Sequence, residues 1–162
     1  DAEKVGSMEQ GVVLREGGRS WLRVVSLLMS LTGLGILLFW VSFFADYAGQ
    51  QQGELAARSA AWFAWERSFP LADAWAALAC LLGGWGLWRS RPQGLLWSLV
   101  ASGALVFLGL IDMLFFLQNG LYLPVTTEIA VEAFIHVWVM ALGWAAIAVV
   151  WRHRRPLGAA VG

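Results

Sequence analysis

The residues of this chain that could carry chemistry are ionisable side chains set in long apolar stretches. Asp73, Asp112 and His136 each lie inside such a stretch, a few residues from one of its ends. A charge in apolar surroundings costs several kcal/mol, so such groups normally face a protein interior, where they pair, hold a proton or line a wet cavity. We therefore take these three residues as the candidate catalytic groups.

Further carboxylates accompany them. Glu128, Glu132 and His136 follow one another at intervals of four residues, so they share one face of a helix. A carboxyl in apolar surroundings can have a raised pKa and donate a proton, which suits isomerisation, and it can also anchor a ligand. Glu66 and Glu132 are candidate ligand-binding residues. A hydrogen-bonded cluster that only ties helices together is the structural alternative.

Metal binding is a weaker interpretation of the same residues. Carboxylates beside a histidine can hold a divalent cation, but the chain has no HExxH motif or comparable spacing. We therefore predict no metal site. The sequence also identifies no cofactor, and the single cysteine, Cys80, lies in an apolar stretch with no second cysteine to form a disulfide.

Aromatic and amide side chains complete the candidate site. Trp40, Trp75 and Trp138 occur near the depth of the ionisable residues, where they could line a pocket for a flat apolar ligand. Packing in the core is the alternative role for each of them. Asn119 lies in a short polar segment beyond the apolar stretch that contains Asp112, and we include it among the candidate ligand-binding residues.

Composition identifies the elements that must hold these residues. The chain has 162 residues, of which 59% are hydrophobic and 14% charged, and it contains 11 tryptophans. Soluble proteins carry roughly 25% charged residues, and indole rings favour the boundary between lipid and water. The formal net charge is zero, so the chain has no basic field for nucleic acid. These features predict a membrane protein, with the lipid bilayer as its first partner.

Four apolar stretches are long enough to cross a bilayer, because a spanning helix needs about 20 apolar residues. The predicted spans are residues 21–45, 69–88, 94–117 and 131–151. The connections between them are short, which favours consecutive helices that are antiparallel neighbours. The predicted fold class is therefore all-α: a polytopic membrane protein with an antiparallel four-transmembrane-helix bundle in residues 21–151.

Basic residues predict the orientation of these spans. Eight of them flank one side of the predicted membrane: Arg15, Arg19, Arg23, Arg89, Arg91, Arg152, Arg154 and Arg155. Only Arg58 and Arg67 occupy the loops on the opposite side. Because cytoplasmic loops carry an excess of Arg and Lys, both termini are expected in the cytoplasm of a multi-pass cell-membrane protein. This topology brings all the acidic candidates to the outer end of the bundle.

The remaining segments have simpler predicted roles. Residues 1–7 end in Gly-Ser before Met8, and we expect them to be a leader added for expression. Residues 8–20 are expected to be a cytoplasmic segment and residues 152–162 a cytoplasmic tail. In the first outer loop, residues 55–65 are amphipathic enough to form a short helix on the membrane interface. Thr126 or Thr127 is expected to cap the fourth span.

The architecture resembles one known group of proteins. Four helices with an acidic cluster near one end, with Trp62-Phe63 and Glu66 before Pro70, resemble the emopamil-binding and sigma-2-receptor group. The resemblance implies binding or isomerisation of a sterol-like molecule. It assigns no role to an individual residue of this chain.

Three functions fit these observations. The first is binding, or isomerisation, of a small lipophilic molecule that reaches the cluster from the outer leaflet. The second is a non-catalytic scaffold subunit of a membrane complex. The third is a proton- or cation-coupled transport component, which would act as a homo-oligomer because the inner halves of the spans lack ionisable side chains apart from Arg23.

Overall fold

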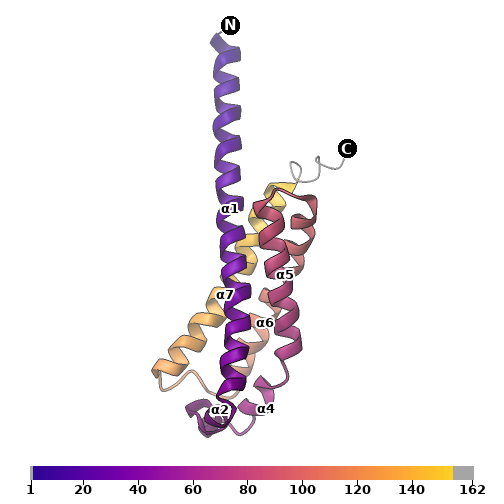
Figure 1. Ribbon diagram of the computed structural model, residues 1–162. Helices are drawn as coiled ribbons and strands as arrows, with labels where there is room; N and C mark the ends of the chain where they lie inside the picture. The colour runs from indigo at the N-terminus through magenta and orange to yellow at the C-terminus, as the bar shows by residue number, and fades with distance from the viewer. Residues whose placement is uncertain (1, 155–162) are drawn as a thin grey trace.

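The computed structural model describes residues 2–154, and it describes the side-chain surroundings of residues 20–154. Seven helices and no strand occur in residues 2–154 (Figure 1). The side chains of residues 1–19 lie outside this description, and they include the predicted leader, Arg15 and Arg19. Residues 155–162 of the predicted tail, which include Arg155, also lie outside it.

Four helices are long and apolar enough to cross a membrane, as predicted. They are α1 (Ala2–Ala45), α5 (Pro70–Trp88), α6 (Pro92–Gln118) and α7 (Thr127–Arg152), and the apolar part of α1 is Ser20–Ala45. The predicted spans agree with these bounds to within four residues. Helix α1 differs from the prediction in where it begins. It includes, without a break, residues 8–20, which we expected to precede the span.

Local sequence explains where three of these helices begin. Pro70 and Pro92 lie in the first turns of α5 and α6, where the missing N–H has no helical partner to lose. The Thr126 side chain caps α7 by accepting a hydrogen bond from the Ile129 N–H at 3.4 Å.

Small residues bring the long helices close together. Helix α5 packs against both α1 and α6, α6 packs against α7, and α1 shares a smaller interface with α7. Ser26 of α1 donates its hydroxyl to the carbonyl oxygen of Gly84 in α5 at 2.6 Å. The Trp138 indole N–H of α7 donates to Thr32 Oγ1 of α1 at 3.0 Å, and this hydrogen bond joins the two helices with the smaller interface.

The segment between α1 and α5 is more broken than predicted. It contains α2 (Tyr47–Gln52), α3 (Glu54–Arg58) and α4 (Trp62–Glu66), so the prediction of one short helix over residues 55–65 is wrong. Ser59 adopts an extended backbone, with φ −138° and ψ 114°, and this ends the helix after one turn.

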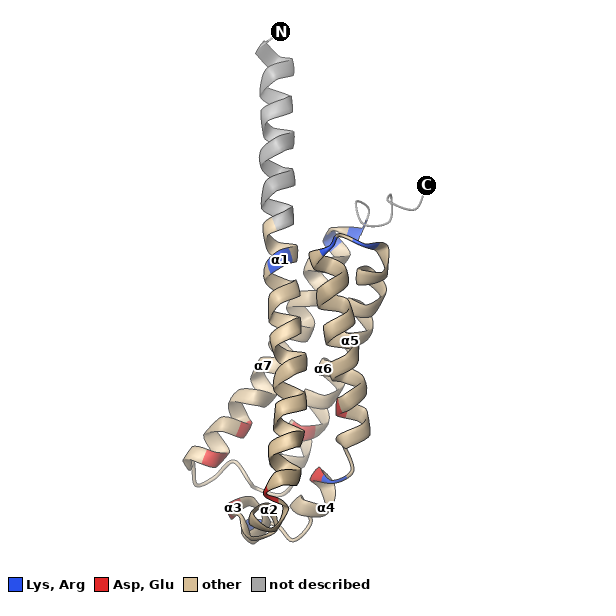
Figure 2. Cartoon of the chain, in the orientation of Figure 1, with Lys and Arg blue, Asp and Glu red and all other residues tan. Residues whose placement is uncertain are grey.

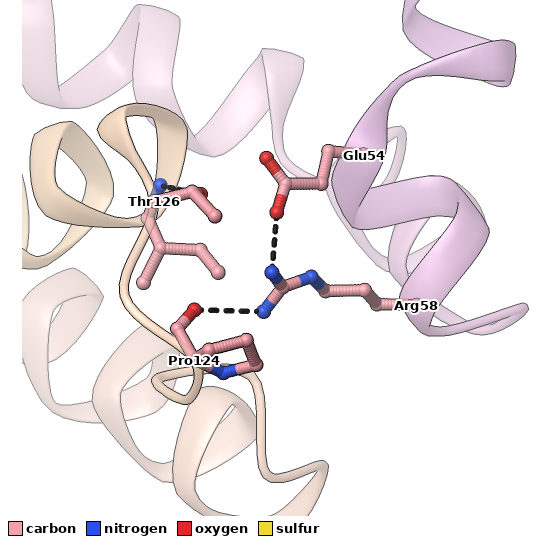
Figure 3. Close-up of polar contacts among 5 residues, drawn as sticks. Glu54, Arg58, Pro124 and Thr126 are labelled. Carbon is pink, nitrogen blue, oxygen red and sulfur yellow. Dashed lines mark hydrogen bonds and ion pairs between the residues drawn. The ribbon is translucent and has the colours of Figure 1, made fainter.

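Arg58 attaches this segment to the loop before α7. Its guanidinium forms an ion pair with Glu54 and donates a hydrogen bond to the Pro124 carbonyl oxygen at 3.0 Å (Figure 3). Thr126, the cap of α7, lies beside these groups in the same view. The contact therefore fixes α3 against the start of α7 at the end of the molecule where the acidic residues lie.

Charges separate along the length of the helices. Figure 2 shows Lys and Arg near the end that carries the α5–α6 turn and the C-terminal part of α7, and Asp and Glu towards the opposite end. Arg58 and Arg67 are the basic residues of the acidic end among the side chains described. This distribution is the one that the charge pattern of the sequence predicts.

Candidate functional site

A cavity of about 440 Å³ lies among the long helices on their acidic side. Its polar wall contains residues from all four long helices and from α4: Thr32, Glu66, Asp73, Asp112, Glu132 and His136. The rest of its wall is apolar, with Leu31 and Ile36 on α1, Leu105 and Leu108 on α6, and Val139 on α7 among its members. The cavity thus has carboxylates at one end and aliphatic side chains at the other.

Helix geometry explains why the carboxylates meet. Asp73 lies one turn into α5, Asp112 lies six residues before the end of α6, and Glu132 lies five residues into α7. At 1.5 Å per residue these positions are about 5 to 9 Å from the same end of the helices. Glu66 ends α4 and approaches them from the segment between α1 and α5.

Asp73 is held by a hydrogen bond across two helices. The Trp40 indole N–H of α1 donates to Asp73 Oδ2 of α5 at 2.9 Å. Trp40 is buried against Phe39 and Phe43, so its ring position is fixed by packing as well. Trp40 therefore orients a cavity carboxylate and does not itself line the cavity.

Polar groups lie near both ring nitrogens of His136, and one of them is within hydrogen-bond distance. The Tyr122 hydroxyl lies 2.9 Å from Nδ1, and Glu132 Oε2 lies 3.9 Å from Nε2. Burial, followed by the charges of Asp112 and Glu132, raises the pKa of Tyr122 above 10.0, so this hydroxyl keeps its proton and can donate it to Nδ1. In that arrangement Nε2 carries the imidazole proton on the side of Glu132. Tyr122 and His136 thus share one hydrogen bond at the cavity wall, and Glu132 lies near Nε2 but beyond hydrogen-bond distance.

Among the candidate residues outside the four long helices, Glu66 is the one whose pKa the structure changes most. Burial, followed by the charges of Glu132, Asp112 and Asp73, raises its pKa from 4.5 to about 8. The folded protein therefore holds this proton more tightly than the unfolded chain does. The contribution of Glu66 to stability is complete below about pH 4.5 and is lost as the pH rises through 8.

This titration predicts a pH effect that one substitution removes. Wild type should lose thermal stability between pH 4.5 and pH 8 more steeply than Glu66→Gln, because an amide has no proton to lose in this range. The measurement is the unfolding temperature in detergent across these pH values. Both proteins keep the other carboxylates, so the difference between the profiles reports the titration of Glu66 together with its coupling to Glu132, Asp112 and Asp73. Parallel profiles would show that Glu66 titrates like an exposed carboxyl.

Two candidates from the sequence lie away from the cavity. Trp75 is 51% exposed on α5 and is not part of the cavity wall. Asn119 ends α6, where its side-chain amide donates to the Phe115 carbonyl oxygen at 2.9 Å, and it is not part of the wall either. The remaining candidates line the cavity, except Trp40, which contacts it through Asp73.

Sequence reasoning missed Thr32 and Tyr122. Thr32 is a polar residue in the middle of an apolar span, and this position could have identified it as a candidate site residue. Tyr122 lies in the α6–α7 loop, 14 residues before His136, so its contact with the imidazole depends on how the loop folds back. No sequence spacing predicts that contact.

The carboxylates of the cavity are spread around an open space and are not gathered at one point. Among the described residues, no group of three or more His, Cys, Asp or Glu side chains is arranged to hold a metal. The carboxylates instead spread around a space large enough for a small molecule.

Known proteins do not supply an assignment: no protein family, curated protein or solved structure matches the chain.

Proposed function

We propose that the four long helices cross a cell membrane as an antiparallel bundle with both termini in the cytoplasm. Many large apolar side chains face outward, including Leu38, Val41, Phe107 and Leu117, each more than 60% exposed. Such a surface is unfavourable in water and suits lipid. The excess of arginine at one end supports the orientation.

The orientation predicts where a C-terminal reporter will lie. An enzyme reporter fused after Gly162 that is active only in the cytoplasm should be active, because the basic residues stay on that side of the membrane. A reporter in the outer loop, after Gln51, should be inactive. Activity of the loop fusion and silence of the C-terminal fusion would reverse the topology and place the cavity in the inner leaflet.

Within this topology, the proposed function is binding of a small lipophilic molecule that carries a positively charged amino group. The observation that carries the proposal is the two-sided cavity, with Glu66, Asp73, Asp112 and Glu132 at one end and aliphatic side chains at the other. No Lys or Arg is among the residues that line the cavity. A bound cation would stabilise the ionised forms of these carboxyl groups, including Glu66, whose pKa is raised to about 8 in the protein alone, and its apolar part would fill the aliphatic end.

The walls of the cavity indicate how such a molecule would reach it. The exposed residues among those lining the cavity are Leu31, Gly35, Phe134 and Ile135. All four belong to α1 or α7, the pair with the smaller interface, and the first turns of α7 lie apart from α1 in Figure 1. The cavity therefore opens sideways between these helices, and in a bilayer this opening would face lipid.

The test compares a cation with a neutral molecule of nearly the same shape. We use 1-octylpiperidine, which is protonated at neutral pH, and the uncharged amide 1-octanoylpiperidine. Binding to the protein in phosphatidylcholine nanodiscs is measured by titration calorimetry, with empty nanodiscs subtracted. The proposal expects saturable binding of the amine that is at least tenfold tighter than binding of the amide. Absence of saturable binding of either molecule would favour the scaffold role.

A further inference from the structure

The α1 edge of the lateral opening contains one residue without a side chain, Gly35. Leu31 and Gly35 lie one turn apart on α1, and both are exposed residues of the cavity wall. On the opposite edge, α7 presents the larger side chains of Phe134 and Ile135. A Cβ atom built on Gly35 would have no heavy atom within 4 Å, so the glycine faces open space.

Packing does not account for this glycine. Gly33, two residues earlier, lies at the α1–α5 interface, where a Cβ would be 2.9 Å from the Ala77 carbonyl oxygen. Gly35 points away from that interface and has no such neighbour. Glycine is also less favourable than leucine or alanine in the interior of a helix. A larger side chain at position 35 would fill part of the open space beside this glycine.

A hydrogen bond closes the gap between α1 and α7 on the cytoplasmic side of Gly35. Trp138 Nε1 donates to Thr32 Oγ1 at 3.0 Å, and Thr32 lies almost one turn before Gly35. Phe134 stacks on Trp138, with ring centroids 6.2 Å apart, and continues the α7 edge towards the acidic end. Gly35 therefore lies on the acidic side of this hydrogen bond, among the exposed residues of the cavity wall.

We propose that Gly35 sets the width of the lateral opening and so limits the size of the apolar body that the cavity admits. The inference rests on the proposed function, because it concerns access to the same site. A leucine at position 35 would project into the opening opposite Phe134 and Ile135. Broad molecules would then be excluded more strongly than narrow ones.

The experiment uses two matched leucine substitutions. Gly103 on α6 is also exposed, also has no heavy atom within 4 Å of a built Cβ, and does not line the cavity. Gly35→Leu and Gly103→Leu therefore make the same chemical change in open space on apolar helices. Association rates in nanodiscs are followed by stopped-flow tryptophan fluorescence, since Trp138 lines the cavity. The probes are 1-octylpiperidine, which is narrow, and 1-(1-adamantylmethyl)piperidine, which is broad.

Gly35→Leu should slow association of the broad amine at least tenfold and that of the narrow amine no more than threefold. Gly35→Ala should give an intermediate effect on the broad amine, and this smaller variant keeps the test valid if Gly35→Leu does not fold. Gly103→Leu should match wild type with both probes. Equal rates for the position-35 variants and Gly103→Leu would overturn the role of Gly35 while leaving the binding site intact. Failure of wild type to bind either amine would overturn the proposed function, and this inference with it.

Discussion

Replacing Asp112 with asparagine is expected to weaken binding of 1-octylpiperidine roughly 30-fold or more while the four helices stay folded. Removing one partner of a buried charge pair typically costs about 2–5 kcal/mol, and about 1.4 kcal/mol corresponds to a factor of ten. Asp112 lines the cavity from α6 with Glu66, Asp73 and Glu132 around it. Asparagine keeps the shape and hydrogen-bonding capacity of the side chain but removes its charge.

Glu128→Gln is the matched control for this variant. Glu128 also lies at the acidic end, in the first turn of α7, but does not line the cavity. Titration calorimetry with the amine should separate the two variants, whereas binding of 1-octanoylpiperidine should be the same in both. If Asp112 only ties helices together, the amide side chain will change the free energy of unfolding by about 0.6–2 kcal/mol and leave ligand affinity unaltered. That result would remove Asp112 from the site.

Gly86→Leu is expected to destabilise the protein by about 3 kcal/mol or more, the largest effect on folding that we predict. Helices α5 and α6 are in close contact near the turn that joins them, where a Cβ on Gly86 would lie 2.5 Å from the Gly94 Cα and 2.7 Å from the Gly94 N. Both Gly94 atoms belong to the backbone, so no flexible side chain can move aside. The helices would have to separate, which would disturb the α5–α6 pair that carries Asp73 and Asp112.

Gly103→Leu again provides the control, because it makes the same substitution at a position with open space. Thermal unfolding in detergent should show a large loss for Gly86→Leu and no loss for Gly103→Leu, since leucine is the better helix former. Similar unfolding temperatures for the two variants would mean that α5 and α6 are not in close contact at Gly86.

The sequence predicted the long helices well because their signal is strong. A run of about 20 apolar residues has few alternative structures, and Pro70, Pro92 and Thr126 fix helix starts by simple rules. The first outer segment gave a weaker signal. Its short amphipathic pattern does not show that Ser59 leaves the helical region and divides the segment into separate turns.

Position along a helix was easier to predict than direction around it. Counting residues brought Asp73, Asp112 and His136 to one end of the long helices, and all three line the cavity. The same count does not give the direction in which Trp75 points. Trp75 follows Asp73 by two residues, so it lies about 200° around the helix from Asp73, on the outer face. The Tyr122–His136 contact depends on loop folding, and the lateral opening depends on how α1 and α7 separate.

The location of a bound amine tests the central claim most directly. A 1-octylpiperidine with a diazirine at the end of its chain can be photolysed with the protein in nanodiscs, and the labelled residues can be identified by mass spectrometry. With the amino group at the carboxylates, the chain end should label buried residues at the aliphatic end of the cavity, at Leu105, Leu108 or Val139. Excess unlabelled 1-octylpiperidine should abolish this labelling. Labelling confined to outward-facing residues such as Phe107 and Leu117, unchanged by competitor, would contradict the proposal that the cavity is a ligand-binding site.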